Sequence, residues 1–264
     1  MPIVGRSVES LLRQLGELFI FIGILWVLVL VQKRRDESQS ILVANALVAG
    51  YGKNPVCAPV SFALEFGRVL ALVGVNGAGK STLLGTCCGL IPPLGGQVSV
   101  LGDRPDPRSG SQRQVLAVDV GGDAFFPSLT VREHLRLVCY GHAVAHPDEV
   151  VATLLDHFGL LRLAGAVPDQ LSGGQRRRLT LASVFARPSD LIVLDEPEQR
   201  LDRTARHMLA FYMRRKRDSG GAVLLATHDV ELVKDVATDV LVVGDEPEPV
   251  DVATGTMKLM EIAS

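Results

Sequence analysis

The sequence has few cysteines, no C-x-x-C pair and no excess of charge of one sign. Its four cysteines stand at no metal-ligand spacing, which argues against a zinc site and favours small buried side chains in a reducing compartment. The formal net charge of -2 offers no general basic surface of the kind that binds nucleic acid. Two local basic runs, Arg176–Arg178 and Arg214–Arg217, are interpreted as solvated helix faces. The chain also lacks internal repeats, so its 264 residues indicate one α/β domain with room for an inserted subdomain.

A hydrophobic run near the N-terminus departs from this globular pattern. Leu18–Val31 carries no charge and is followed closely by the basic run Lys33–Arg35. Extended back to Leu11, it reaches the ~20 residues of a membrane-spanning helix, with the basic residues on the cytoplasmic side. A cleaved signal peptide is disfavoured because the run ends in basic rather than small residues. We therefore expect a transmembrane helix at about residues 11–31; an interfacial helix, a helix docked on a membrane partner and a mistaken start codon are the alternatives.

The rest of the chain has the pattern of an α/β domain. Residues 32–40 are polar and aperiodic, which predicts a linker between an N-terminal segment 1–40 and a domain 41–264. In that domain, short apolar runs alternate with helical periodicity, as is typical of a mostly parallel sheet covered by helices. About residues 124–178, helical patterns without a convincing strand predict an inserted helical subdomain. The predicted strands are Ile41–Val48, Val60–Glu65, Val69–Val73, Gln97–Leu101, Val115–Val120, Leu191–Leu194, Ala222–Ala226 and Val240–Val243.

The segment Gly74–Ser81 (GVNGAGKS) fits the pattern G-x-x-x-x-G-K-[ST] at every fixed position. It follows an apolar run and precedes a helical pattern, which is the context that this phosphate-binding loop needs. Gly77 and Gly79 let backbone N–H groups turn toward phosphates, and the helix N-terminus adds a favourable dipole. We expect Lys80 to neutralise the β- and γ-phosphates of a nucleotide and Ser81 to bind Mg²⁺. The alternative is a glycine-rich strand-to-helix turn that happens to contain lysine.

Two further motifs lie about 90 and 110 residues downstream. Ser172 and Gln175 of LSGGQ have capping-box spacing, so this pentapeptide opens a helix whose exposed N–H groups form a second phosphate site. One domain already has a phosphate site in the Gly74–Ser81 loop, so we expect this second site to bind the nucleotide of another copy of the domain. Leu191–Glu196 is an apolar strand that ends in two carboxylates. Strand alternation lets Asp195 reach a metal while Glu196 faces a water beside the γ-phosphate.

Two shorter elements complete the series. Asp202 begins a further helix as a plausible N-cap. His228 follows another apolar strand, where it could hydrogen-bond the γ-phosphate; the alternative is that it is a surface helix cap.

Together these elements make the chain resemble the ATP-binding cassette (ABC) family from about Ile41 to Gly244. The resemblance implies a P-loop core with a mostly parallel sheet, an antiparallel β region in the N-terminal part of the cassette and an inserted helical subdomain. It implies head-to-tail dimers with two ATP molecules between the subunits, Glu196 as general base, His228 holding the γ-phosphate, Asp202 linking the sites, and Ser81 and Asp195 on the metal. The implied ATP-binding residues are Tyr51, Gly74, Asn76, Gly77, Ala78, Gly79, Lys80, Ser81 and Thr82. The signature residues that would face the partner's ATP are Leu171, Ser172, Gly173, Gly174 and Gln175.

One departure from the family concerns a glutamine that usually touches Mg²⁺ and senses the membrane partner. At the matching position this sequence has Gly121, flanked by Asp119 and Asp123. Either aspartate could replace the metal contact, although neither reproduces an amide. The sequence therefore predicts hydrolysis with altered coupling or metal preference.

The resemblance implies the motor subunit of a transporter, with ATP and Mg²⁺ as cofactors and no nucleic-acid partner. One predicted span cannot form a pathway, so we expect a separate multi-span permease, a second cassette and a location on the cytoplasmic face of the plasma membrane. The segment Phe126–Leu135 resembles cassettes of exporters, which favours export. A regulatory cassette on a membrane complex and a cytosolic nucleic-acid or ribosome-associated cassette are the alternative functions.

Overall fold

The structure is a computed structural model that describes residues 40–121 and 125–263. The transmembrane helix expected at about residues 11–31 lies outside these residues, as does Asp123. Among the helices of the described ranges, none combines the length and the apolar character that crossing a membrane requires.

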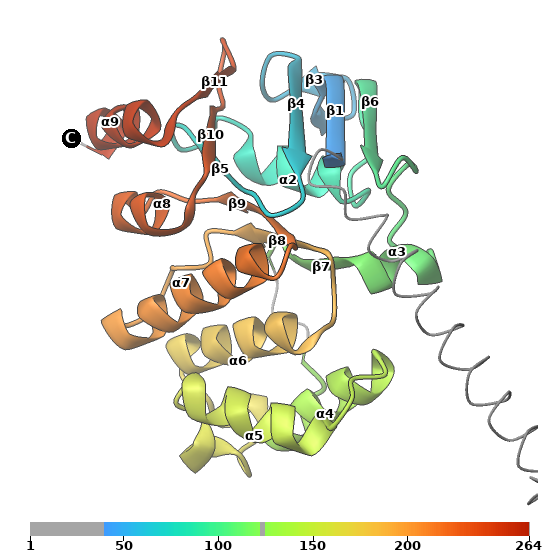
Figure 1. Ribbon diagram of the computed structural model, residues 1–264, viewed down its shortest axis with the longest axis vertical. Coiled ribbons are helices and arrows are strands. Elements are labelled where there is room, and N and C mark those ends of the chain that lie inside the picture. Colours follow the sequence, from blue (N-terminus) through green and yellow to red (C-terminus); the bar gives the residue numbers. More distant parts are fainter. Residues whose placement is uncertain (1–39, 122–124, 264) are drawn as a thin grey trace, which may run out of the picture. The chain divides into compact units, whose positions relative to one another are not determined.

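Six strands form the central sheet in the order β11-β10-β5-β9-β8-β7 (Figure 1). Strands β10, β5, β9, β8 and β7 are parallel, and β11 pairs antiparallel at the edge. Every residue of β5 and β9 is buried, as their apolar runs predict for strands covered on both faces. The strands are β5 Val69–Val73, β7 Leu116–Asp119, β8 Leu191–Asp195, β9 Ala222–Ala226, β10 Asp239–Val242 and β11 Glu248–Val250.

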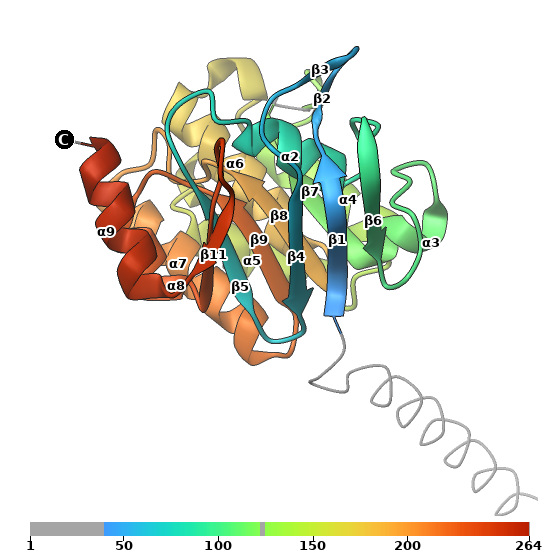
Figure 2. The ribbon, with the colours of Figure 1, turned by 90° about the horizontal axis from the view of Figure 1, so that it is seen from above.

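A second, antiparallel sheet has the order β4-β1-β6 and provides the antiparallel region expected in the N-terminal part of the domain. Helix α2 (Lys80–Cys87) contacts β6 of this sheet and also β8 and β9 of the central sheet, and Figure 2 shows it between the two. A short hairpin, which the sequence did not predict, follows β1. The strands are β1 Ser40–Val48, β2 Gly50–Tyr51, β3 Asn54–Pro55, β4 Val60–Glu65 and β6 Gly95–Val100.

Alternate residues of the central strands divide between two hydrophobic clusters. In β5, Val69, Ala71 and Val73 join one cluster, and Leu70 and Leu72 join the other. The first cluster reaches the helices that follow β7, and the second reaches α2 and the antiparallel sheet. Each fully buried Val or Leu stabilises the fold by about 1.5–3 kcal/mol relative to exposure. The two clusters therefore fix the end of β5, where the candidate site begins.

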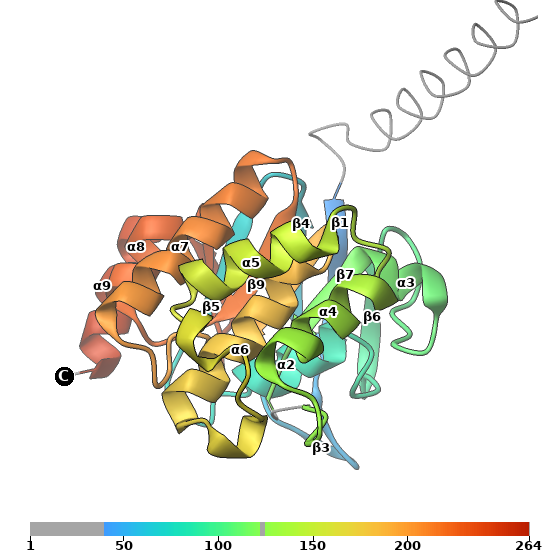
Figure 3. The same ribbon diagram turned by 90° about the horizontal axis from the view of Figure 1, so that it is seen from below.

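The segment between β7 and β8 is helical (Figure 3). Its first helix, α4, starts with the predicted capping box of Thr130 and Glu133. Phe158 is fully buried and stacks on Phe185 of α6 and Tyr212 of α7, so aromatic packing joins this segment to the rest of the domain. Its elements are α4 Val131–Gly141, α5 Pro147–His157, the 3₁₀ turns η1 Leu161–Leu163 and η2 Pro168–Gln170, and α6 Gly173–Ala186. The remaining helices are α3 Gly110–Val115, α7 Arg203–Asp218, α8 Val230–Val236 and α9 Val252–Ala263.

Candidate nucleotide-binding site

The loop between β5 and α2 has the backbone shape that its glycines predict. Gly79 is the N-cap of α2 with φ of 92°, and a Cβ at this position would lie 2.6 Å from Cγ2 of Val56. Only glycine fits both the left-handed backbone and this close approach. The N-cap makes no side-chain hydrogen bond, so the first amide groups of α2 have no side-chain cap. The geometry is therefore open to an anionic ligand, with Asn76 and Ser81 exposed and Ala78 and Thr82 buried.

Lys80 turns its ammonium group back into this loop. Its Nζ donates to the carbonyl oxygens of Gly74, at 2.8 Å, and Val75, at 2.9 Å, and the residue is buried. Burial lowers the pKa of Lys80, and the negative charges of Glu196 and Asp195 act in the opposite direction. The cation of the loop is thus electrostatically coupled to the carboxylates at the end of β8.

Asp195 is the last residue of β8, and its Oδ1 is buried with no hydrogen-bond partner among residues 40–121 and 125–263. A buried carboxylate oxygen of this kind is costly unless a cation or donor completes it. Mg²⁺ is usually held by one or two protein oxygens together with phosphates and waters, so the residues present fit it. Within the described residues there is no cluster of three or more His, Cys, Asp or Glu that would form an all-protein cage.

Glu196 follows the strand in a left-handed conformation, with φ of 44°. Its N–H donates to the carbonyl oxygen of Ala226 at 2.8 Å, and its Oε2 accepts from the Gln199 amide. Its Oε1 lies 3.4 Å from Nε2 of His228. The strand ends at Asp195, so this left-handed turn, rather than strand alternation, sets the direction of Glu196.

His228 is half-buried just beyond β9. Burial and the positive charge of Lys80 lower its pKa, while Glu196 and Asp195 act to raise it. Asp229, not His228, is the N-cap of α8 and accepts from Leu232 N–H. The surface-cap alternative for His228 is therefore wrong.

Glu198 positions the segment that carries His228, and it was not predicted from the sequence. Its Oε1 accepts from the Thr227 hydroxyl at 2.6 Å and from the His228 N–H at 3.3 Å. Burial raises the pKa of Glu198, although the bond from Thr227 lowers it. The sequence does contain one signal for it, because Glu198 is a third carboxylate that follows Asp195, Glu196 and a proline directly.

Arg177 is a second residue that the sequence did not predict, because the run Arg176–Arg178 has the composition of a solvated helix face. The interpretation of this run as a solvated face is wrong for Arg177, whose side chain is 14% exposed and makes a 2.6 Å ion pair with Asp119. Asp119 therefore faces Arg177 rather than an open metal position. One signal could have located Arg177: Leu181, one turn later on the same helix face, is apolar and buried.

The LSGGQ segment opens α6 as predicted. The Ser172 hydroxyl accepts from Gln175 N–H, and the Gln175 side chain accepts from Ser172 N–H at 2.8 Å. Leu171 is buried and Ser172 exposed, while Gly173 and Gly174 pack on the loop at Arg200. Within the described residues, no hydrogen bond joins this segment to the Gly74–Ser81 loop.

The other predicted residues occupy separate places. Asp202 is the N-cap of α7 and accepts from Ala205 N–H at 2.8 Å. Tyr51 is 60% exposed on the β2–β3 hairpin, which continues into Val56 beside Gly79. Gly121 has φ of 95°, in the left-handed region that glycine favours.

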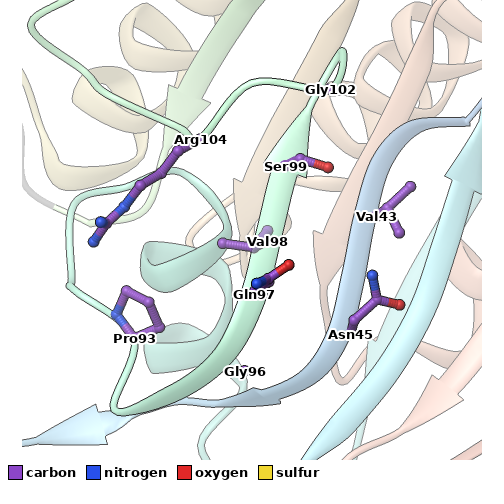
Figure 4. A pocket seen from close by; sticks show the side chains of 9 residues that line it. All are labelled: Val43, Asn45, Pro93, Gly96, Gln97, Val98, Ser99, Gly102 and Arg104. Carbon is purple, nitrogen blue, oxygen red and sulfur yellow. The ribbon is translucent and has the colours of Figure 1, made fainter.

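A hollow of about 600 Å³ lies over β1 and β6, away from these motifs. Asn45, Gln97 and Arg104 are among the side chains that line it (Figure 4). It contains none of the residues that the sequence predicted for a nucleotide.

Comparison with known proteins identifies the family. The family model "ABC transporter" matches residues 57–199. The chain belongs to the ABC transporter family. The chain is 37% identical over 183 residues to Nod factor export ATP-binding protein I of Burkholderia orbicola, covering 69% of this chain and 60% of that protein. It is 36% identical to the cytochrome c biogenesis ATP-binding export protein CcmA of Paramagnetospirillum magneticum, covering 72% of this chain and 89% of that protein.

The structural comparison agrees with the family. A solved ATP-binding subunit of an ABC transporter superposes with a TM-score of 0.73 and 25% identity, covering 84% of this chain and all of that one. The chain spans about 60% of the length of the first Nod factor relatives.

Proposed function

We propose that this chain is the ATP-binding and ATP-hydrolysing subunit of an ABC transporter and that it powers export through a separate multi-span permease. The observation that carries the proposal is the convergence of Lys80, Asp195, Glu196 and His228 at the ends of β5, β8 and β9. Their charges influence one another, and Glu196 lies 3.4 Å from His228. This arrangement combines a phosphate-binding cation, a metal-binding carboxylate and a general base.

In the proposed site, Lys80 and the amide groups of Gly74–Thr82 bind the phosphates. Tyr51, exposed on the neighbouring hairpin, stacks on the adenine. Ser81 and Asp195 would hold Mg²⁺, which neutralises phosphate charge when bound. Glu196 takes the proton of the attacking water, and His228 orients Glu196 and the γ-phosphate.

The proposed site is completed by a second cassette. Leu171–Gln175 has no hydrogen bond to the loop of its own chain within the described residues, while Ser172 is exposed at a helix N-terminus. We propose that Ser172 and Gly174 face the γ-phosphate held by the partner cassette, and that Asp202 links the two sites. Closure on ATP and opening after hydrolysis would then move the permease.

The direction and place of transport are proposed from the relatives. Both named relatives are described as export proteins. We accordingly propose export, with this subunit on the cytoplasmic face of the membrane. The predicted helix at residues 11–31 stays a prediction.

The test is Mg²⁺-dependent ATP turnover by the full chain and by Glu196→Gln. Glu231→Gln is the matched control, because Glu231 is an exposed carboxylate on α8. We expect Glu196→Gln to reduce kcat by about 100- to 10,000-fold with ATP binding retained, and Glu231→Gln to match the wild type. Equal turnover by Glu196→Gln and the wild type would contradict the assigned base.

A further inference from the structure

The guanidinium of Arg177 joins three segments of the candidate site. Its Nη1 donates to Oδ2 of Asp119 at 2.6 Å, in an ion pair whose side chains are 14% and 4% exposed. Arg177 belongs to α6, which begins at the LSGGQ segment, and Asp119 is the last residue of β7. The pair therefore links the signature helix to the end of the strand that leads into the helical segment.

The same guanidinium also binds the main chain at the end of β8. Its Nη2 donates to the carbonyl oxygens of Asp195 at 3.2 Å and Glu196 at 3.1 Å, and its Nε donates to that of Pro197 at 3.3 Å. A planar guanidinium with five N–H donors can serve several acceptors in fixed directions, which a lysine ammonium cannot do. Arg177 is thus bound to three consecutive residues around the proposed general base.

These bonds act on a strained peptide unit. Glu196 has φ of 44°, a conformation that is unfavourable for a residue other than glycine and persists where its surroundings hold it. Its N–H is bound by the carbonyl of Ala226 in β9, and its carbonyl is bound by Arg177 in α6. The direction of the Glu196 carboxylate toward His228 therefore depends on α6 as well as on the sheet.

We propose that Arg177, held by Asp119, is a positioning residue that fixes Glu196 in its left-handed conformation and couples the position of α6 to ATP hydrolysis. This inference rests on the proposed function and adds a link from the signature helix to the general base. A shift of α6 moves the guanidinium and thereby releases or restores the main chain at Glu196.

The test compares Arg177→Gln and Arg177→Lys in the full chain, with Arg178→Gln as the control. Arg178 is the next arginine of the same helix, and its Nη1 lies 3.4 Å from the carbonyl oxygen of Phe158, away from Glu196. Arg177→Gln should lower kcat about 10- to 100-fold, with KM for ATP changed less than about 3-fold. Arg177→Lys keeps a charge for Asp119 but cannot serve all three carbonyls. The Tm of Arg177→Lys should therefore lie closer to that of the wild type than the Tm of Arg177→Gln does, while the kcat of Arg177→Lys stays low.

A purely structural role predicts different results. Recovery of kcat together with Tm in Arg177→Lys, or wild-type kcat in Arg177→Gln, would overturn the proposal. Asp119→Asn tests the second partner. If the two residues act as one unit, Asp119→Asn combined with Arg177→Gln should reduce kcat no more than Arg177→Gln alone. Additive losses would remove Asp119 from the proposal.

Amide hydrogen exchange separates this inference from the proposed function. In Arg177→Gln, peptides covering residues 195–200 should exchange faster than in the wild type, while peptides of α2 stay unchanged. If the wild type does not turn over ATP, the proposed function fails, yet this comparison still decides whether Arg177 holds Glu196. Unchanged exchange at residues 195–200 would overturn the positioning role.

Discussion

Replacing Thr227 by valine tests the network that places His228. Thr227 is fully buried, its hydroxyl donates to Oε1 of Glu198 at 2.6 Å, and its Oγ1 accepts from Asp229 N–H at 3.0 Å. Valine has nearly the same shape, so the change removes two hydrogen bonds without opening a cavity. The bond to a carboxylate contributes about 1.5–3 kcal/mol, and the bond from the Asp229 N–H adds about 0.5–1.5 kcal/mol. We expect a loss of about 3 kcal/mol at neutral pH and a Tm lower by about 6–12 °C.

The loss should depend on pH. Burial raises the pKa of Glu198 above its ordinary 4.5, the bond from Thr227 opposes this, and the charge of Asp229 adds to the rise. Between 4.5 and the folded-state pKa, the native state binds more protons than the unfolded state, so stability falls as pH rises. Valine removes the bond from Thr227 that lowers the pKa of Glu198, so the pKa rises further and stability falls more steeply as the pH increases. The stability that Thr227→Val loses should therefore be larger at about pH 8 than at about pH 4.5. At the lower pH Glu198 is protonated, so its bond with the Thr227 hydroxyl is a neutral one that contributes only about 0.5–1.5 kcal/mol.

Denaturant unfolding at the two pH values measures the effect, with Thr86→Val as the control. Thr86 is also fully buried, but its hydroxyl donates to the main-chain carbonyl of Thr82. The control should lose about 0.5–1.5 kcal/mol at both pH values. A Thr227→Val deficit that is equal at both pH values, or no larger than that of Thr86→Val at pH about 8, would refute the reasoning.

Three further changes probe the loop, the signature and the core. Lys80→Ala removes the cation that we propose binds the phosphates and should weaken ATP binding by about 10- to 150-fold in calorimetry, with the fold retained in circular dichroism. Gly174→Ala places a Cβ 2.8 Å from the carbonyl oxygen of Arg200. It should therefore displace that loop, lower the free energy of unfolding by about 1–3 kcal/mol and reduce ATP turnover. Wild-type stability together with wild-type turnover would count against the close contact. Phe158→Ala removes a fully buried ring that stacks on Tyr212, and should cost about 3–5 kcal/mol; a loss below about 1 kcal/mol would mean that the helical segment does not depend on this packing.

Much of the fold was predictable because hydrophobic runs and their spacing are local properties. All eight predicted strands are present, and their ends differ from the prediction by at most two residues. The helix Val252–Ala263 was not predicted, since its glycine and β-branched residues favour helix weakly. It packs on β10, where a Cβ at Gly255 would lie 2.6 Å from Val240. That contact is between segments and could not be inferred from the helix alone.

In the candidate site, too, local motifs could be predicted from the sequence and long-range contacts could not. The phosphate loop, LSGGQ, the Asp195–Glu196 pair and His228 could be located from the sequence, because each is a short motif of residue types at fixed spacing. LSGGQ opens a helix, and the other three lie at the end of an apolar strand. The burial of Arg177 against Asp119 and the bond from Thr227 to Glu198 could not be predicted, since these partners are 58 and 29 residues apart in the chain. Burial and long-range pairing depend on how α6, β8 and β9 pack, and packing also forces Glu196 into a conformation that its residue type does not favour.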